Sequence, residues 1–406
     1  MARQFPSDHP TGDCILFSTA DWKTPYWTNK QHTATFLAES GWRVLYVETV
    51  GLRAPNLANG RDLNRLIKRL IRGLKALVLG PERVSDNLWI LPPLALPAMH
   101  HIAGARSINQ SLLRSTISRF LKRHHFEKPL IWTYHPYVGE VLKGVSTGNL
   151  IYHCVDDLAA IPGVDAIAFN REEVNLLKKC KAVFTTAAAL QEKCLRYNAN
   201  TYFLPNVVDE IHFGRARSPG KIPSEMEAIP QPRLVYHGVL SDFKVNAELL
   251  QEVFIARPDW SLVLIGDERV GQSDPALNRL RQMANVHFLG YRPYELLPDY
   301  LRGMSVGLLP TVLNDYTRSM FPMKFYEYLA SGLPVVSTPL DFTRKGHPFL
   351  KVGSDASEFC AAIANQLKRG KLDANEVAIA VGENTWTMRL KKMLDLARET
   401  KEDPRS

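Results

Sequence analysis

The sequence predicts an α/β protein built from two doubly wound parallel sheets. Short apolar runs that suit buried strands alternate with helical patterns over the first half of the chain, and a second alternating set starts at Arg233. This alternation is typical of parallel sheets joined by right-handed crossovers. At 406 residues the chain also exceeds the size at which one core usually stops growing, about 250–300 residues. Two domains are therefore expected.

Each expected element follows from a local pattern. Residues 28–40 illustrate the helices, because Thr28 is a suitable N-cap and Gly41 a suitable stop. The first half is expected to hold strands at 14–18, 42–48, 129–133, 149–155 and 181–185, and further helices at 61–79, 107–125, 136–143, 168–179 and 187–196. The second half is expected to hold strands at 233–237, 261–265, 286–289, 305–309 and 333–337, and helices at 246–255, 275–283, 295–301, 322–331, 356–368 and 385–400.

Composition predicts a linker between the two halves of the chain. The stretch 215–232 is rich in Pro, Ser and charged residues and has no periodicity, which is typical of a linker. The predicted organisation is a first domain at 1–210, a linker at 211–232, a second domain at 233–380 and a C-terminal segment at 381–406.

Bulk properties limit the classes of protein. The 50 Lys and Arg exceed the 41 Asp and Glu, and the net charge of +9 favours anionic partners. The five cysteines are scattered without a Cys-x-x-Cys pair, which favours reduced thiols in the cytoplasm and disfavours a zinc site. No apolar run approaches the ~18 residues of a membrane span, and no signal peptide is visible. Nucleic acid, a nucleotide sugar and an anionic membrane all remain possible partners at this point.

The most informative stretch runs from Pro322 to Ser337. It predicts a helix that starts at a proline and stops at Gly332, followed by a buried strand. Lys324 and Glu327 are three residues apart and therefore share one face near the helix N-terminus, which favours phosphate. A lysine for an anion and a glutamate for paired hydroxyls suit a nucleotide-linked sugar. The alternative is an amphipathic helix with a solvated Lys/Glu pair.

The motif Pro322-x-Lys324-x-x-Glu327-Tyr-x-Ala-x-Gly332-x-Pro334-Val-Val resembles the donor site of GT-B glycosyltransferases, in particular family 4 (group 1), and is similar to that of the xanthan glucuronosyltransferase. The resemblance implies two Rossmann-like domains facing a cleft, with the last helix crossing back to the first domain. It places Met323 and Lys324 at the diphosphate and Glu327 on the ribose hydroxyls. Family 4 usually has another Glu where this chain has Ser319, so the contact with the transferred sugar differs, and retaining or inverting stereochemistry stays open.

Two further stretches carry the same resemblance. Gly238-Val-Leu-Ser-Asp-Phe-Lys244 resembles the family's Gly-Arg-Leu-x-x-x-Lys turn, in which glycine lets the backbone approach phosphate and Lys244 would neutralise it. Val239 replaces the family's Arg, and Arg318 is a candidate substitute. Gly290-Tyr-Arg292-Pro293 resembles the loop whose backbone reads the nucleobase. No Asp-x-Asp element is placed to hold a metal, so a metal-independent enzyme without a cofactor is expected, with a nucleoside diphosphate sugar such as a UDP-sugar as donor.

Two stretches of the first half are candidates for acceptor binding and catalysis. The loop with Asp21, Trp22, Lys23 and Asn29 is similar to an acceptor-side loop of the xanthan enzyme, although its aromatic residues would equally suit core packing. The resemblance makes Asp156, at the carboxyl end of a predicted strand, the catalytic base that an inverting reaction requires. The alternative is a helix cap, which applies mainly to the neighbouring Asp157.

The predicted helix 61–79 combines an apolar stripe with many cations. Its basic residues include Arg65, Lys68, Arg69 and Arg72. A basic helix with such a stripe is typical of an element that lies on an anionic membrane surface. The alternative is that the stripe packs on the domain and the cations face water. Basic residues beside an apolar stripe, without interleaved aromatics, disfavour nucleic-acid binding.

Together these features predict a cytoplasmic glycosyltransferase, peripheral on the inner face of the plasma membrane. It would transfer a sugar to a saccharide acceptor, for example one linked to polyprenyl diphosphate, in the synthesis of a cell-surface polysaccharide or glycolipid. A nucleotide-sugar 2-epimerase of the same fold and a non-catalytic assembly subunit are the alternatives. The sugar, the base and the acceptor do not follow from the sequence.

Overall fold

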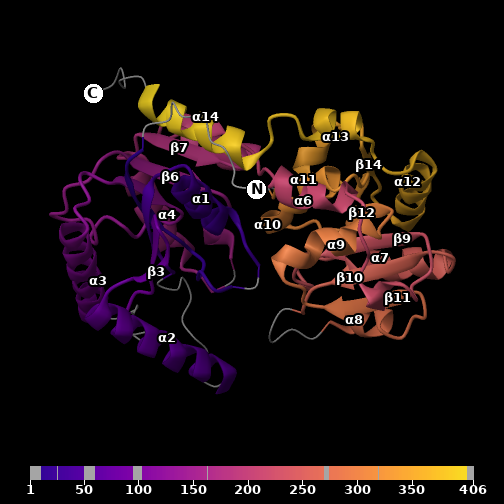
Figure 1. Cartoon of the computed structure of the whole chain (residues 1–406), viewed down its shortest axis with the longest axis horizontal. Helices are drawn as coiled ribbons and strands as arrows, with labels where there is room; N and C mark the ends of the chain where they lie inside the picture. Colours follow the sequence, from indigo (N-terminus) through magenta and orange to yellow (C-terminus); the bar gives the residue numbers. More distant parts are fainter. Residues whose placement is uncertain are drawn as a thin grey trace. The chain divides into compact units, whose positions relative to one another are not determined.

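The computed structural model describes residues 11–24, 26–49, 60–94, 103–161, 163–268, 274–318 and 320–399, with side chains of the first two long helices described from residues 70 and 108 onward. The chain divides into two compact units (Figure 1). Unit 1 comprises residues 1–204 and 390–406, and unit 2 comprises residues 205–389.

Unit 1 is built on an eight-stranded sheet with the order β3-β4-β2-β1-β5-β6-β7-β8. All neighbouring strands are parallel except β3, which runs antiparallel to β4. The strands are β1 (Asp13–Phe17), β2 (Arg43–Val47), β3 (Glu82–Ser85), β4 (Leu88–Leu91), β5 (Leu130–Thr133), β6 (Leu150–Cys154), β7 (Ala182–Thr185) and β8 (Thr201–Phe203). The predicted wound sheet is confirmed, and β3, β4 and β8 extend it with strands too short to predict.

The helices of unit 1 follow the expected alternation with one exception. They are α1 (Asn29–Glu39), α2 (Gly60–Leu79), α3 (Ala103–Arg123), α4 (Ala166–Leu177) and α5 (Ala188–Leu195). At the start of α1 the Thr28 amide donates to Gln31 Oε1 at 3.1 Å, which satisfies an otherwise unpaired backbone donor. The helix expected at 136–143 is wrong, because this stretch forms turns. Gly139 and Gly144, which favour turns over helix, lie within and after it.

Unit 2 contains a six-stranded, all-parallel sheet with the order β11-β10-β9-β12-β13-β14. Its strands are β9 (Arg233–His237), β10 (Ser261–Ile265), β11 (Val286–Gly290), β12 (Val306–Leu309), β13 (Val335–Ser337) and β14 (Leu350–Val352). Its helices include α7 (Ala247–Ala256), α8 (Pro275–Leu280), α9 (Leu297–Arg302), α10 (Asp315–Arg318), α11 (Met323–Ala330), α12 (Ala356–Arg369) and α13 (Ala374–Val381). This is the second wound sheet that the sequence predicts. The last helix, α14 (Trp386–Glu399), begins in unit 2, and from Leu390 onward it belongs to unit 1.

The stretch 211–232 differs from the aperiodic linker that the composition predicts. It contains most of α6 (Glu210–Gly214) and two short 3-10 turns, Arg215–Arg217 and Ser224–Met226. Phe213 and Met226 are fully buried in the core of unit 2. These elements are too short to show a helical period, and Phe213, Ala216 and Met226 are buried whereas Ile211 is exposed.

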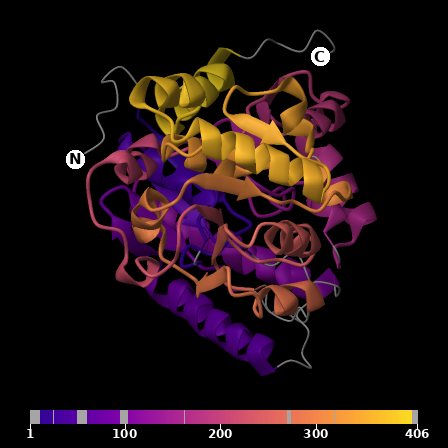
Figure 2. The ribbon, with the colours of Figure 1, turned by 90° about the vertical axis from the view of Figure 1, so that its right-hand side faces the viewer.

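Over the part of the chain that the structure describes, no helix combines the length and the apolar character needed to cross a bilayer. The longest helices, α2 and α3, both lie in unit 1 (Figures 1 and 2).

Candidate functional site

The helix α11 places the two charged residues of the motif. It begins at Met323, directly after Pro322, and ends at Ala330, before Gly332 at φ +80°. Its apolar face, with Phe325, Tyr328 and Leu329, is buried in the core of unit 2. The packing of these residues fixes the helix, so its first turn has a defined position beside the carboxyl end of β9.

The side chain of Lys324 lies against the turn that follows β9. A Cβ built on Gly238 would come within 2.6 Å of Lys324 Cε and 2.8 Å of Lys324 Nζ, and Gly238 itself has φ +119°. The ammonium group also lies 5.3 Å from the ring centroid of Tyr236. Two motifs that are far apart in the sequence therefore meet, and glycine is required at their contact for both space and backbone conformation.

Glu327 lies one turn further along the same helix and is buried. Its Oε2 is 3.3 Å from Nε2 of His237, the last residue of β9. Burial raises the pKa of Glu327 to about 7, and the positive charge of Lys324 opposes this shift. Burial lowers the pKa of Lys324, which Glu327 opposes, and burial together with Lys324 lowers the pKa of His237 well below its usual range. A ligand that carries both an anion and hydroxyl donors would stabilise the charged forms of Lys324 and Glu327 together.

Lys244 belongs to the loop between β9 and α7. Its Nζ is 3.4 Å from the hydroxyl of Tyr316 and 4.9 Å from the centre of that ring. The same loop is held by Asn314, whose side-chain amide donates to the carbonyl of Phe243 at 2.7 Å. The position of Lys244 is thus fixed by contacts with the segment that precedes α11. Ser319 lies outside the described residues.

Arg292 has a packing role that the motif does not indicate. Its guanidinium pairs with both oxygens of Glu225 at 2.8 Å, and its Nε donates to the Tyr300 hydroxyl at 2.6 Å. These bonds tie the 3-10 turn of Glu225 to α9. The predicted contact with a nucleobase concerns the backbone of the 290–293 loop and stays a prediction.

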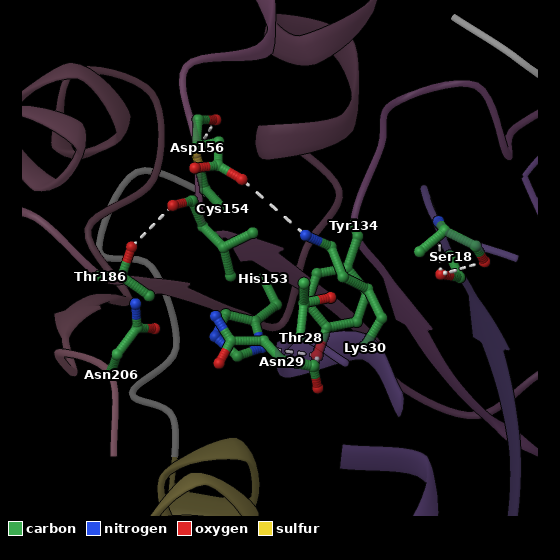
Figure 3. Close-up of polar contacts among 12 residues, drawn as sticks. Ser18, Thr28, Asn29, Lys30, Tyr134, His153, Cys154, Asp156, Thr186 and Asn206 are labelled. Atoms are coloured by element: carbon green, nitrogen blue, oxygen red, sulfur yellow. Dashed lines mark hydrogen bonds and ion pairs between the residues drawn. The ribbon is translucent and has the colours of Figure 1, made fainter. Parts of the chain in front are cut away.

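In unit 1, Asp156 follows the carboxyl end of β6. Its Oδ2 is 3.8 Å from Nζ of Lys30, whose side chain is only 8% exposed (Figure 3). Lys30 lies in the first turn of α1, with its ammonium 5.5 Å from the ring centroid of Tyr134. The role of Lys30 could not be predicted from the sequence, because a lysine in a polar segment gives no sign that it will be buried.

Asp157 stands at the start of a 3-10 turn, Leu158–Ala160, but its side chain makes no capping hydrogen bond. It pairs instead with Lys193 at 3.2 Å, and Lys193 also pairs with the buried Glu173 at 2.8 Å. Glu173 in turn accepts a hydrogen bond of 2.6 Å from the Tyr152 hydroxyl. The described contacts therefore assign Asp157 to an ionic network and not to a helix cap.

A group of buried polar side chains lies near Lys30 (Figure 3). The Tyr134 hydroxyl is 2.9 Å from the Thr33 hydroxyl, 3.1 Å from the carbonyl of Asn29 and 3.1 Å from Nδ1 of His153. The rings of Tyr134 and His153 stack with their centroids 4.9 Å apart. Asn29, a predicted acceptor residue, is thus part of a hydrogen-bonded cluster at the carboxyl edge of β5 and β6.

The other predicted acceptor residues lie in the loop after β1. Trp22 is largely buried, packs against Trp27 and Tyr46 with centroid distances of 5.2 and 5.1 Å, and donates its amide to Glu48 Oε1 at 2.7 Å. The packing alternative fits Trp22. The carbonyl of Asp21 accepts from Gln31 Nε2 at 3.0 Å. Lys23 is exposed and pairs with Glu82 at 3.0 Å.

The predicted membrane helix α2 has an exposed apolar side. Ile71 and Val78 are 62% and 71% exposed, whereas Gly73 and Ala76 are buried. Arg72 pairs with Glu48 at 2.5 Å, so this cation also contributes to the packing of unit 1. The side chains of Arg65, Lys68 and Arg69 lie outside the described residues.

Residues 231–369 match the family model described as "Glycosyl transferases group 1". The chain is 29% identical over 102 residues to TuaH of Bacillus subtilis (strain 168), a protein described as a teichuronic acid biosynthesis glycosyltransferase, and this match spans 25% of each chain.

Solved structures resemble nearly the whole chain. Sucrose-phosphate synthase from Thermosynechococcus elongatus matches with a TM-score of 0.63 at 16% identity, over 96% of this chain and 97% of that one. Anabaena HepE, in complex with UDP and glucose, matches with a TM-score of 0.64 at 15% identity, over 95% of this chain and 99% of that one. The chain therefore has the GT-B fold, and residues 231–369 of its second unit match the family model for glycosyl transferases group 1.

Proposed function

We propose that this protein is a glycosyltransferase that moves a sugar from a nucleoside diphosphate sugar to a saccharide acceptor. The observation that carries the proposal is the meeting of Lys324 with Gly238 beside the buried Glu327. Solved structures of the same fold have been obtained with UDP, which supports this class of donor. Lys324 and the α11 N-terminus would stabilise the leaving diphosphate, and Glu327 would accept hydrogen bonds from the ribose.

The proposal extends to the surroundings of the site. Lys244, Met323, Ser319 and the 290–293 loop with Arg292 are proposed donor contacts, and Asp21, Lys23 and Asn29 are proposed acceptor contacts. Cationic side chains would replace a metal ion in charge stabilisation, so activity without added metal is expected.

The similarity to a teichuronic acid protein supports a cell-surface polysaccharide as product. The exposed apolar side of α2 supports a peripheral place on an anionic cytoplasmic membrane face and a lipid-linked acceptor.

Binding of nucleoside diphosphates tests the donor site. A ligand that binds only the folded state raises the melting temperature by mass action, so UDP or GDP should raise that of the wild type. In Glu327→Ala the shift should largely disappear, because the ribose loses its acceptor. Glu376→Ala is a suitable control, since Glu376 caps α13 and pairs with Arg369 within the same unit. A full shift in Glu327→Ala would remove Glu327 from the site.

Asp156 can be tested separately from donor binding. We propose that it takes the proton of the acceptor hydroxyl, and Lys30 would hold its carboxylate in place. Asp156→Asn should keep the thermal shift with nucleoside diphosphate and reduce sugar transfer by roughly 10²-fold or more. The measurement is nucleoside diphosphate released on addition of acceptor. Asp157→Asn is the matched control, and wild-type turnover in Asp156→Asn would refute the assignment.

A further inference from the structure

The last residue of β9 is a buried histidine for which the proposed donor site gives no role. The backbone amide of His237 donates to the Tyr328 hydroxyl at 3.2 Å. Its ring lies edge-on to the Tyr328 ring, with centroids 5.1 Å apart and an interplanar angle of 84°, and nearly parallel to Phe213 at 6.4 Å and 23°. These contacts fix the plane of the imidazole in the core of unit 2.

The fixed ring directs one nitrogen at the ribose-binding carboxylate. His237 Nε2 is 3.3 Å from Glu327 Oε2. Among the described residues this buried nitrogen has no hydrogen bond of good geometry. A small rotation of the carboxylate would complete the bond, and a buried polar atom left without one is costly. Glu327 is therefore the expected hydrogen-bond partner of His237 Nε2 after this small rotation.

We infer that His237 is a positioning residue of the donor site, whose Nε2–H donates to Glu327 and holds its carboxylate ready for the paired ribose hydroxyls of a nucleoside diphosphate. This inference rests on the proposed function. It gives each carboxylate oxygen a separate task, because Oε2 would be held by the imidazole while Oε1 stays available to the ligand.

The charges around the pair support a neutral imidazole that acts as a donor. The titratable groups that face it are Lys324 and Tyr328, both on α11. Burial raises the pKa of Tyr328, so its hydroxyl stays neutral, and Lys324 disfavours a second cation at His237. A neutral ring with its proton on Nε2 favours the ionised carboxylate. The other tautomer would accept a hydrogen bond from protonated Glu327, would favour the neutral carboxyl and would have the opposite effect on ligand binding.

The test is the affinity for UDP and GDP between pH 5.5 and 8.5, measured by calorimetry on the full chain. In the wild type the affinity should rise with pH as Glu327, with a pKa of about 7, loses its proton. In His237→Phe the affinity at pH 7.5 should fall roughly tenfold, as expected for the loss of a hydrogen bond to a charged group. The midpoint of the pH profile should also move upward.

Three further variants separate positioning from packing. His237→Gln should restore most of the affinity, because its amide nitrogen can lie near the position of Nε2. His237→Asn should behave like His237→Phe, since its shorter amide does not reach Glu327, and it serves as the second test if the Phe variant fails to fold. His287→Phe, at a part-buried histidine on β11 in the same unit, should leave both affinity and midpoint unchanged.

Equal affinity and an unchanged midpoint in both His237→Phe and His237→Asn would overturn the inference, and so would a downward shift of the midpoint. If the wild type binds no nucleoside diphosphate at any pH, the proposed function fails and the inference fails with it. If the wild type binds and the His237 variants bind equally well, only the inference fails.

Discussion

At the scale of single residues, the proposed donor site depends on Gly238, which has no side chain. Lys324 occupies the space where any residue other than glycine at 238 would place its Cβ. The contact explains why a glycine in the turn after β9 and a lysine at the start of α11 are needed together. It also contributes to the partial burial of Lys324.

Substitution of this glycine should weaken anion binding. In Gly238→Ala the methyl group would displace the ammonium of Lys324, and diphosphate affinity should fall roughly tenfold or more. The positive φ adds a cost in folding stability of about 1–2 kcal/mol. Gly346→Ala is the matched control, because Gly346 also has positive φ (+66°) and a Cβ there would meet nothing within 4 Å.

Both variants should therefore melt at a lower temperature than the wild type, and only Gly238→Ala should lose affinity for UDP or GDP in a titration. Equal loss of affinity in the two variants would attribute the effect to backbone strain. Unchanged affinity in Gly238→Ala would mean that Lys324 does not need its present position to hold the diphosphate.

The sequence predicts the residues of the site better than it predicts their partners. The spacing of Lys324 and Glu327 follows from the helical period, so their shared turn could be predicted. The contact of Glu327 with His237 and that of Asp156 with Lys30 join residues that are distant in sequence. No local pattern encodes such contacts, because they depend on which helix packs beside the end of which strand.

At the scale of elements, α2 shows what the spacing of apolar residues predicts about a helix and what it does not predict. The repeat of its apolar residues predicts one stripe. In the structure Leu70 and Leu77 are half-buried along one edge of this stripe, whereas Ile71, Leu74 and Val78 are exposed along the other. The small residues Gly73 and Ala76 are buried, and a Cβ built on Gly73 would lie 2.7 Å from Leu94 Cα. A period shows that a helix is amphipathic, but it does not show how much of the apolar face the fold itself uses.

The exposed edge of α2 gives a prediction about membrane binding. The wild type should float with vesicles that contain an anionic lipid, because each apolar side chain removed from water contributes about 1.5–3 kcal/mol. The double variant Ile71→Glu with Val78→Glu should lose most of this binding. The double variant Ile167→Glu with Ile379→Glu adds the same charge at side chains that are 85% and 71% exposed elsewhere, and it should still float.

Flotation of the Ile71/Val78 variant at the wild-type level would favour a role for this surface other than membrane binding. Loss of flotation in both double variants would show that net charge, and not the position of α2, controls the interaction. Melting temperatures should change little in either case, since the substituted side chains are exposed.

At the scale of the whole molecule, alternation of strands and helices is sufficient to predict two wound sheets, and composition is not sufficient to predict where the units divide. Residues 205–232 lack periodicity, yet Phe213 and Met226 are core residues of unit 2, and Glu225 binds Arg292. The two ends of unit 2 are also joined, because Val208 bridges Thr385 and Arg389 donates to the carbonyl of Pro205. A stretch of chain can belong to a core through a few residues that a compositional average does not detect.

The assignment of residues 205–232 to the core of unit 2 predicts which fragment of the chain folds. A fragment of residues 205–389 retains both joined ends and should unfold cooperatively, bind UDP or GDP and lose that binding on Glu327→Ala. A fragment of residues 233–389, cut at the boundary that composition suggests, lacks Phe213 and Met226, and a large apolar side chain removed from a core costs about 3–5 kcal/mol. Because a domain of this size has a total stability of only about 5–15 kcal/mol, the shorter fragment should show no cooperative transition in thermal or urea unfolding. Phe213→Ala in the longer fragment provides the intermediate case and should lower its melting temperature without abolishing the transition. Cooperative unfolding of the shorter fragment at the same midpoint as the longer one would contradict the assignment of 205–232 to unit 2 and would restore the linker.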